Sequence, residues 1–257
     1  EVAMRRVGMR VLRGLMGCAV LWLGLFFARP SLVLPLPSLQ EIQNRRLAPS
    51  SLIVDRQGRL LYEIVDPHTG MHRPTPLDEI PLALRQAIIA TEDATFYQNL
   101  GINLRAVLRA LWLNLQSGEV VSGGSTITQQ LARNLLLEPE ARLDRSLWRK
   151  AREAVMAHHL TRSLSKDESL ELYLNETYFG SMAYGAEAAA RAYFGKPLAQ
   201  LDLAECALIA GLPQAPGRYN PLTDLPAAKA RQQVVLQLMV KAGYISAQEA
   251  ERAHREP

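Results

Sequence analysis

Three glutamates are the candidates for acid–base chemistry in this sequence. Glu92 follows an apolar helical pattern at residues 81–90, Glu153 closes a basic run, and Glu171 lies between leucines. A lone glutamate on a helix is most often a solvated surface group. Two carboxylates that face one cleft can instead act as an acid and a base, because burial and neighbouring cations tune their pKa values. Such a pair requires a tertiary contact, since the three residues lie far apart in the sequence.

A second signal is the stretch Gly-Gly-Ser-Thr-Ile-Thr-Gln-Gln-Leu at residues 123–131. Its glycines allow a tight bend and the close approach of a ligand, and Ser125 or Thr126 can cap the helix that follows. The N-terminus of that helix favours an anion, phosphate above all. An ordinary capped helix is the better explanation of Gly-Gly-Ser alone, but the adjacent Gln129 and Gln130 favour binding of a polar ligand.

Basic side chains are available to hold a phosphate. Each is better explained as a surface charge when taken alone, but together they could form a clamp; they are Arg133, Arg149, Lys150 and Lys166. Ser163 and Lys166 also match the Ser-x-x-Lys pattern of penicillin-reactive enzymes. We reject that interpretation because the chain has no Ser-Asp-Asn or Lys-Thr-Gly partner, and because residues 165–168 form a helix-capping box.

The elements that must position these residues are mostly helical. Strand patterns appear only at residues 51–55 and 59–65, on either side of a turn. His68 and His72 follow in a polar loop, and without a third ligand nearby we expect both on the surface. From residue 77 on, apolar periodicity and capping signals predict helices. These lie at residues 81–90, 103–115, 127–135, 144–160, 165–174, 185–194, 202–209, 224–240 and from 246 on.

The first 36 residues predict a membrane anchor. Residues 1–13 are basic, and residues 14–28 are uncharged and almost wholly apolar. Residues 26–30 make a poor cleavage site, which favours an uncleaved anchor over a signal peptide, and the basic flank places the N-terminus in the cytoplasm. We therefore expect a tail and transmembrane anchor at residues 1–36, a linker or stem with short strands at 37–76, and the main domain at 77–257.

The distribution of charge argues against nucleic-acid binding. The formal net charge of +4 is carried by residues 1–29, so the rest of the chain is neutral. A nucleic-acid-binding domain would carry its excess positive charge on the folded part. Cys18 and Cys206 suggest neither a disulfide framework nor a metal site.

Taken together, the residues resemble the five motifs of the peptidoglycan glycosyltransferase domain (glycosyltransferase family 51), found in class A penicillin-binding proteins and monofunctional transglycosylases. In the family's order, these motifs are Glu-Asp-x-x-Phe at 92–96, residues 123–131 with Arg133 and Asn134, Arg149-Lys150-x-x-Glu153, residues 166–175, and Arg231-x-x-Val234-Val235-Leu236. The resemblance covers the chain from about residue 50 to its end. It implies a mainly α, lysozyme-like fold with a small β element on its N-terminal side, preceded by one transmembrane helix.

The resemblance also implies a reaction: polymerisation of lipid II into β-1,4 glycan strands, with inversion and release of undecaprenyl pyrophosphate. Glu92 would be the general base, and Glu153 would assist departure of the pyrophosphate, directly or through Arg149, Lys150 or a divalent cation. Glu171 would have a supporting structural role. The residues implied to contact substrate are Asp93, Phe96, Gly124, Ser125, Thr126, Gln129, Gln130, Arg133, Asn134, Arg149, Lys150 and Lys166.

The chain departs from the family pattern at Asn99, where His is usual, and at Ser169, where Ile is usual. Asn99 keeps the capacity to hydrogen-bond but cannot carry a proton. Two other functions stay open. One is a lysozyme-like glycan hydrolase or lytic enzyme, for which the phosphate-ready loop would be superfluous. The other is a non-catalytic membrane-anchored scaffold, for which loss of Glu92 or Glu153 would be expected.

The implied location is the outer face of the bacterial cytoplasmic membrane, with a single span. The implied partners are lipid II, the growing lipid-linked glycan, the membrane, a transpeptidase domain or partner, and divisome or elongasome proteins. We expect no tightly bound cofactor, with a divalent cation, Mg²⁺ or Mn²⁺, left open. The apolar segment around Trp112 either dips into the membrane interface or packs in the core.

Overall fold

The computed structural model describes residues 36–65, 70–103, 106, 109, 124–137 and 146–256. The expected anchor lies outside these residues except for Leu36, and so does Trp112. Within the described ranges, no helix combines the length and apolarity needed to cross a membrane.

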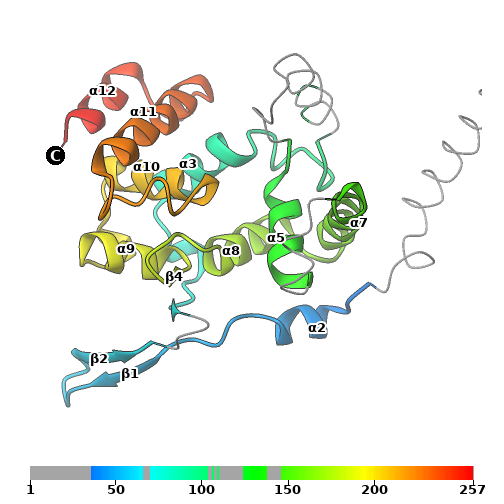
Figure 1. Cartoon of the computed structure of the whole chain (residues 1–257), viewed down its shortest axis with the longest axis horizontal. Helices are drawn as coiled ribbons and strands as arrows, with labels where there is room; N and C mark the ends of the chain where they lie inside the picture. The colour runs from blue at the N-terminus through cyan, green and yellow to red at the C-terminus, as the bar shows by residue number, and fades with distance from the viewer. Residues whose placement is uncertain are drawn as a thin grey trace, which may run out of the picture.

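The described part of the chain is mainly helical, with a small amount of β structure (Figure 1), as the sequence predicts. The helices are α2 (Leu39–Asn44), α3 (Leu82–Glu92), α5 (Ile127–Leu136), α7 (Leu147–Ser163), α8 (Lys166–Glu176), α9 (Ala186–Phe194), α10 (Leu203–Gly211), α11 (Leu225–Lys241) and α12 (Ala247–Arg255). Short 3-10 turns are η2 (Leu77–Glu79), η3 (Leu198–Gln200) and η4 (Leu212–Gln214).

Side-chain caps start several of these helices, because a helix leaves its first backbone N–H groups without partners. Reciprocal capping boxes form between Thr126 and Gln129, Ser165 and Glu168, Asp202 and Glu205, and Ser246 and Glu249. The predicted start of α7 is corrected. Ser146 caps this helix through the N–H of Arg149, and α7 begins at Leu147 instead of near residue 144.

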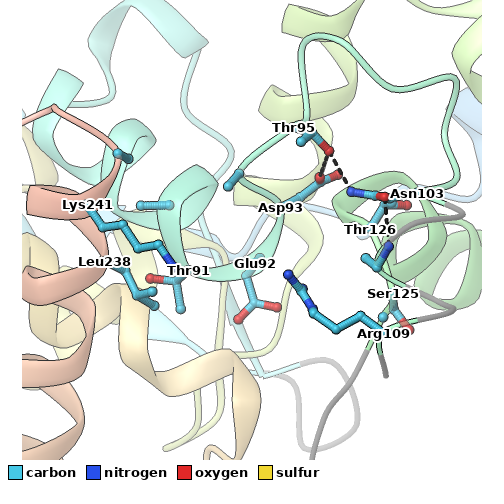
Figure 2. A pocket seen from close by; sticks show the side chains of 15 residues that line it. Thr91, Glu92, Asp93, Thr95, Asn103, Arg109, Ser125, Thr126, Leu238 and Lys241 are labelled. Carbon is cyan, nitrogen blue, oxygen red and sulfur yellow. Dashed lines mark hydrogen bonds between the residues drawn. The ribbon is translucent and has the colours of Figure 1, made fainter. Parts of the chain in front are cut away.

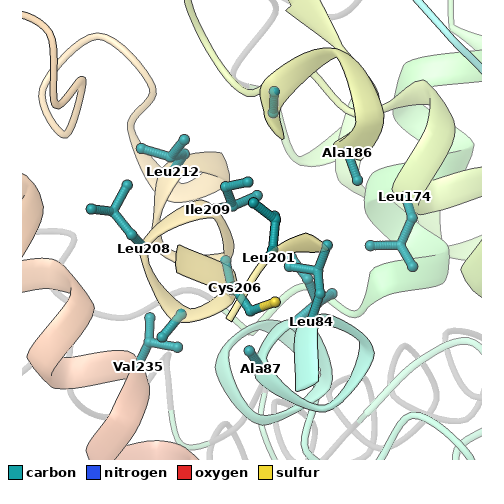
Figure 3. Packing of buried hydrophobic residues seen from close by; sticks show 14 of the residues in the cluster. Leu84, Ala87, Leu174, Ala186, Leu201, Cys206, Leu208, Ile209, Leu212 and Val235 are labelled. Carbon is teal, nitrogen blue, oxygen red and sulfur yellow. The ribbon is translucent and has the colours of Figure 1, made fainter. Parts of the chain in front are cut away.

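Two hydrophobic clusters hold the helices together. The larger one is built from α3, α8, α9, α10 and α11 and includes the buried side chains of Leu84, Cys206 and Val235 (Figure 3). The smaller one joins α5, α7 and α8 through residues such as Leu131 and Leu160. Glu92 therefore belongs to a helix of the larger cluster, and Glu153 to a helix of the smaller one.

The strands form two small pairs. The antiparallel hairpin of β1 (Ser51–Val54) and β2 (Leu60–Ile64) confirms the two strands predicted around a turn, and it projects away from the helices (Figure 1). The parallel pair of β3 (Met71–His72) and β4 (Ala183–Tyr184) packs beside α9. This second pair brings the segment before the helical domain into contact with its middle.

The prediction that His72 lies on the surface is wrong. His72 is 1% exposed. Its Nδ1 lies 3.2 Å from the carbonyl oxygen of Ala48, and its Nε2 lies 3.9 Å from Oε1 of Glu176. The contacts that enclose the His72 ring come from the distant residues Ala48 and Glu176, and local polarity gave no sign of them. His68 lies outside the described residues.

Candidate active site

Glu92 is the last residue of α3, and two side chains orient its carboxylate. Gln130 Nε2 donates to Glu92 Oε2 at 2.6 Å, and the Tyr173 hydroxyl donates to Gln130 Oε1 at 3.4 Å. Because the amide oxygen of Gln130 accepts the hydrogen bond from Tyr173, the amide nitrogen of Gln130 faces the carboxylate of Glu92. A residue from α5 and one from α8 thus fix the direction of Glu92.

The environment of Glu92 suits a proton acceptor. Burial raises the pKa of Glu92, since a desolvated carboxylate loses its hydration, and Asp93 adds to this through like charge. The hydrogen bond from Gln130 and the charges of Arg231 and Arg133 oppose the rise in pKa. A carboxylate with a raised pKa is a stronger base once it is ionised.

Asp93 turns toward the N-terminus of α5. Asn99 Nδ2 donates to both Asp93 oxygens, at 2.9 and 2.8 Å, and the Ile127 N–H lies 3.4 Å from Oδ2. Burial raises the pKa of Asp93, and these hydrogen bonds partly offset the rise. The helix N-terminus that the sequence indicates as a phosphate site therefore already faces a carboxylate of the protein.

Glu153 lies on α7 and is 1% exposed. Its Oε1 accepts from Arg149 Nη1, and its Oε2 accepts from Lys150 Nζ at 2.9 Å. Lys150 Nζ also donates to Ser125 Oγ at 2.6 Å. Among the described residues, the buried Nε of Arg149 has no hydrogen-bond partner. Two cations thus flank one carboxylate, and one of the two reaches the loop before α5.

A cavity of about 370 Å³ lies beside Glu92 and Asp93 (Figure 2). Its walls come from the C-terminal end of α3, the loop after it, the residues directly before α5 and the C-terminal end of α11, together with Asn103, Ala106 and Arg109. Glu92, Asp93 and Ser125 are among the lining residues. Because Ser125 both lines this cavity and binds Lys150, it joins the Glu92 side of the site to Glu153.

The other residues expected to contact substrate lie in different parts of the structure. Gly124 and Thr126 line the same cavity. Gln129 is 3% exposed, and its side chain is engaged in the α5 capping box. Asn134 lines a different cavity of about 200 Å³. These positions favour a structural role for Gln129, and substrate contact by either residue stays a prediction.

Phe96 and Lys166 form a stacked pair beside the loop after α3. The Lys166 ammonium lies 4.7 Å from the Phe96 ring centroid, and the Phe96 ring is fully buried. Lys166 Nζ also donates to Asn99 Oδ1 at 3.3 Å. Glu171 Oε2 accepts from the Leu77 N–H at 2.9 Å, which agrees with the expected supporting role.

Some residues of the site were missed by sequence reasoning. Arg231 influences Glu92 from α11, while Arg109 and Lys241 line the cavity, and Figure 2 shows the Arg109 guanidinium turned toward Glu92. Tyr173 was noted only as part of a motif. Arg231 was named in the fifth motif but given no role at the site, whereas nothing in the local sequence predicts a role for Lys241.

Comparison with known proteins matches this chain to a family. A family model described as a transglycosylase matches residues 57–240. Penicillin-binding protein 1A of Escherichia coli (strain K12) is 44% identical over 223 residues, which are 86% of this chain and 25% of that protein. Penicillin-binding protein 1A of Pseudomonas aeruginosa is 41% identical over 224 residues, 86% of this chain and 26% of that protein.

A solved structure also matches. The crystal structure of penicillin-binding protein 1A from Haemophilus influenzae aligns with a TM-score of 0.48 at 28% identity, covering 82% of this chain and 21% of that chain. The chain thus spans about a quarter of the length of the relatives it matches.

Proposed function

Since the chain belongs to the transglycosylase family, we propose that it is a peptidoglycan glycosyltransferase that polymerises lipid II into β-1,4 glycan strands. The observation that carries the proposal is the single cavity with Glu92 in its wall and Ser125 connecting it to the Arg149–Lys150–Glu153 cluster. This transfer needs a base in the cavity wall and cations for the leaving group close by, and Ser125 connects the two.

Glu92 is the general base of the proposed reaction. It takes the proton of the acceptor 4-hydroxyl as that oxygen attacks C1 of the donor sugar. The bond from C1 to the pyrophosphate oxygen breaks with its electron pair on that oxygen, and the new glycosidic bond has inverted configuration. Gln130 and Tyr173 support this role by directing the carboxylate, and burial supports it by raising the Glu92 pKa.

Arg149 and Lys150 receive the leaving pyrophosphate, and Glu153 holds both cations in place. Arg149 has an unused buried donor among the described residues, which suits an incoming phosphate oxygen. Both oxygens of Glu153 already accept from cations. The Glu153 carboxylate is therefore occupied by Arg149 and Lys150, which leaves it poorly suited to bind a divalent metal ion. No step of the proposed reaction passes through such an ion.

The first experiment is Glu92→Gln in the full chain, assayed for glycan polymerisation from lipid II in detergent. Because amide nitrogen and oxygen have no basicity to replace the carboxylate, the rate should fall by about 100-fold or more. Glu251→Gln makes the same change on exposed α12 and should keep the wild-type rate. Polymerisation by Glu92→Gln at a rate near that of wild type would refute the assignment.

The size of the product separates transfer from hydrolysis. A transferase lengthens chains from lipid-linked substrate, whereas a lysozyme-like hydrolase shortens preformed glycan. The cation cluster beside the cavity favours transfer, because a neutral glycan has no pyrophosphate to receive. A scaffold would make neither product.

We further propose that the chain works at the outer face of the bacterial cytoplasmic membrane, anchored by residues 1–36. Its partners would then be lipid-borne substrates and a transpeptidase domain. The basic and apolar pattern of the N-terminus supports this location. The membrane contact predicted around Trp112 lies outside the described residues and stays a prediction.

A further inference from the structure

The loop at residues 93–101 connects Glu92 at the end of α3 to the N-terminus of α5. It begins directly after Glu92 and ends at Gly101, whose carbonyl accepts from Thr126 Oγ1 at 2.6 Å. At its start, Asp93 accepts from the first N–H of α5. Both ends of the loop are therefore tied to the N-terminus of the helix that carries Gln130.

Asn99 holds these two ends together. Its amide nitrogen donates to both oxygens of Asp93, and its amide oxygen accepts from the Gly101 N–H at 2.9 Å. The same oxygen accepts from Lys166 Nζ at 3.3 Å, which adds the N-terminus of α8 to the assembly. Asn99 thus contacts the end of α3 and the start of α8 directly, and α5 through Asp93 and Gly101.

We propose that Asn99 is a positioning residue that holds Glu92 in a fixed position relative to the start of α5. Its amide does not titrate, so its hydrogen bonds do not depend on pH. This inference rests on the proposed transfer reaction. Without Asn99, Asp93 loses its two amide hydrogen bonds and Gly101 loses the acceptor for its N–H. The hydrogen bond between Asp93 and the start of α5 is then less well held, and Gln130 no longer lies at a fixed distance from Glu92.

The amide is suited to this position in a way that an imidazole is not. It supplies donors and an acceptor together at every pH, whereas neutral histidine has one of each and protonated histidine has no acceptor. The charged and titratable groups facing this loop include Asp93 within it, Lys166 from α8 and His158 from α7, whose Nδ1 lies 3.4 Å from the Leu100 carbonyl oxygen. Arg85 from α3 and Tyr244 act on Tyr97 of the loop. Asp167 also reaches the loop, accepting from the Tyr97 hydroxyl at 2.9 Å.

An introduced histidine would therefore make the geometry depend on pH. A protonated imidazole would donate one N–H to Asp93 and direct the other at the Gly101 N–H and the Lys166 ammonium, from which it cannot accept. Asn99→His should then show an acid limb in kcat that is absent from wild type. Asn99→Ala should lose rate at every pH, because neither end of the loop is held.

The test is polymerisation of lipid II by the full chain in detergent, with kcat and KM measured between pH 5.5 and 8.5. We expect Asn99→Ala to lower kcat by about 10- to 100-fold, as a misplacement of about 1 Å would, with KM changed less than about threefold. Gln98→Ala is the matched control, since its exposed side chain neighbours Asn99 in the sequence. It should keep the wild-type profile.

Two outcomes would overturn the inference: a wild-type kcat in Asn99→Ala, or a profile for Asn99→His of the same shape as wild type. Thermal unfolding of each variant separates loss of fold from loss of positioning, and Asn99→His provides a second variant if Asn99→Ala does not fold. If wild type itself fails to polymerise lipid II, the proposed function fails. If wild type polymerises and the variants match it, only the role of Asn99 fails.

Discussion

At the scale of the residue, Glu92 carries a conflict between function and stability. Burial that raises its pKa disfavours the ionised carboxylate in the folded protein. In the unfolded chain the same group has an ordinary pKa of about 4.3. Between the pKa of the unfolded state and that of the folded state, the folded protein binds more protons. The contribution of Glu92 to stability therefore falls as the pH rises from the lower of these pKa values to the higher.

Glu92→Gln should therefore stabilise the fold while it removes activity. The neutral amide avoids the cost of desolvating a charge, and its oxygen can still accept from Gln130. We expect Tm at pH 7.5 to rise by about 2–4 °C, equivalent to ~1 kcal/mol in a domain of this size. The advantage should vanish near pH 4, where Glu92 of the wild type is protonated. Calorimetry at both pH values measures it, and an equal shift at both would contradict this explanation.

At the scale of the element, α7 and the loop after α3 are in close contact. Gly101 has φ +87°, and a Cβ there would lie 2.6 Å from the Ala157 carbonyl oxygen on α7. A side chain at this position must move either the loop or the helix. The close approach explains how the Glu92 loop and the helix bearing Glu153 keep a fixed relation.

Gly101→Ala should destabilise the protein by about 1–3 kcal/mol, through backbone strain and the clash with α7. Gly58→Ala is the matched control, because Gly58 has a similar φ of +78° but nothing lies within 4 Å of its added Cβ. The difference between the two variants in urea unfolding isolates the cost of the contact with α7. Equal destabilisation by both would show that the contact has little effect.

At the scale of the whole molecule, the proposed catalytic groups lie on different hydrophobic clusters. Glu92 ends a helix of the larger cluster, and Glu153 lies on α7 of the smaller one. α8 contributes side chains to both clusters, and the hydrogen bond from Gln130 of α5 to Glu92 of α3 spans them at the site. The geometry of the site thus depends on how the two clusters pack, which α8 fixes.

The β1–β2 hairpin lies apart from this arrangement. Its large apolar side chains are exposed, Leu61 at 66% and Tyr62 at 63%, so they add little buried area to the fold. Replacing residues 52–62 with a Gly/Ser linker should change Tm by less than about 2 °C and keep polymerisation, since Glu63 still pairs with Arg73. Calorimetry and the lipid II assay test this. A large loss of Tm would show that the hairpin stabilises the helical domain.

The sequence by itself determined where most of the helices lie and several of their caps. Apolar periodicity located α3, α5 and α8 within a few residues, whereas the roles that the motifs suggest for Glu92, Glu153 and the cations beside Glu153 stay predictions. These features are local, because a cap or an amphipathic face depends on residues a few positions apart.

Only the tertiary structure decided which groups meet. It placed Asp93 at the start of α5, directed Gln130 to Glu92 through Tyr173, and buried His72 beside Ala48 and Glu176. It also brought Lys241 and Arg109 to the cavity. These contacts join residues tens of positions apart, and they follow from how the two hydrophobic clusters pack. No pattern along the chain encodes that packing at any single site.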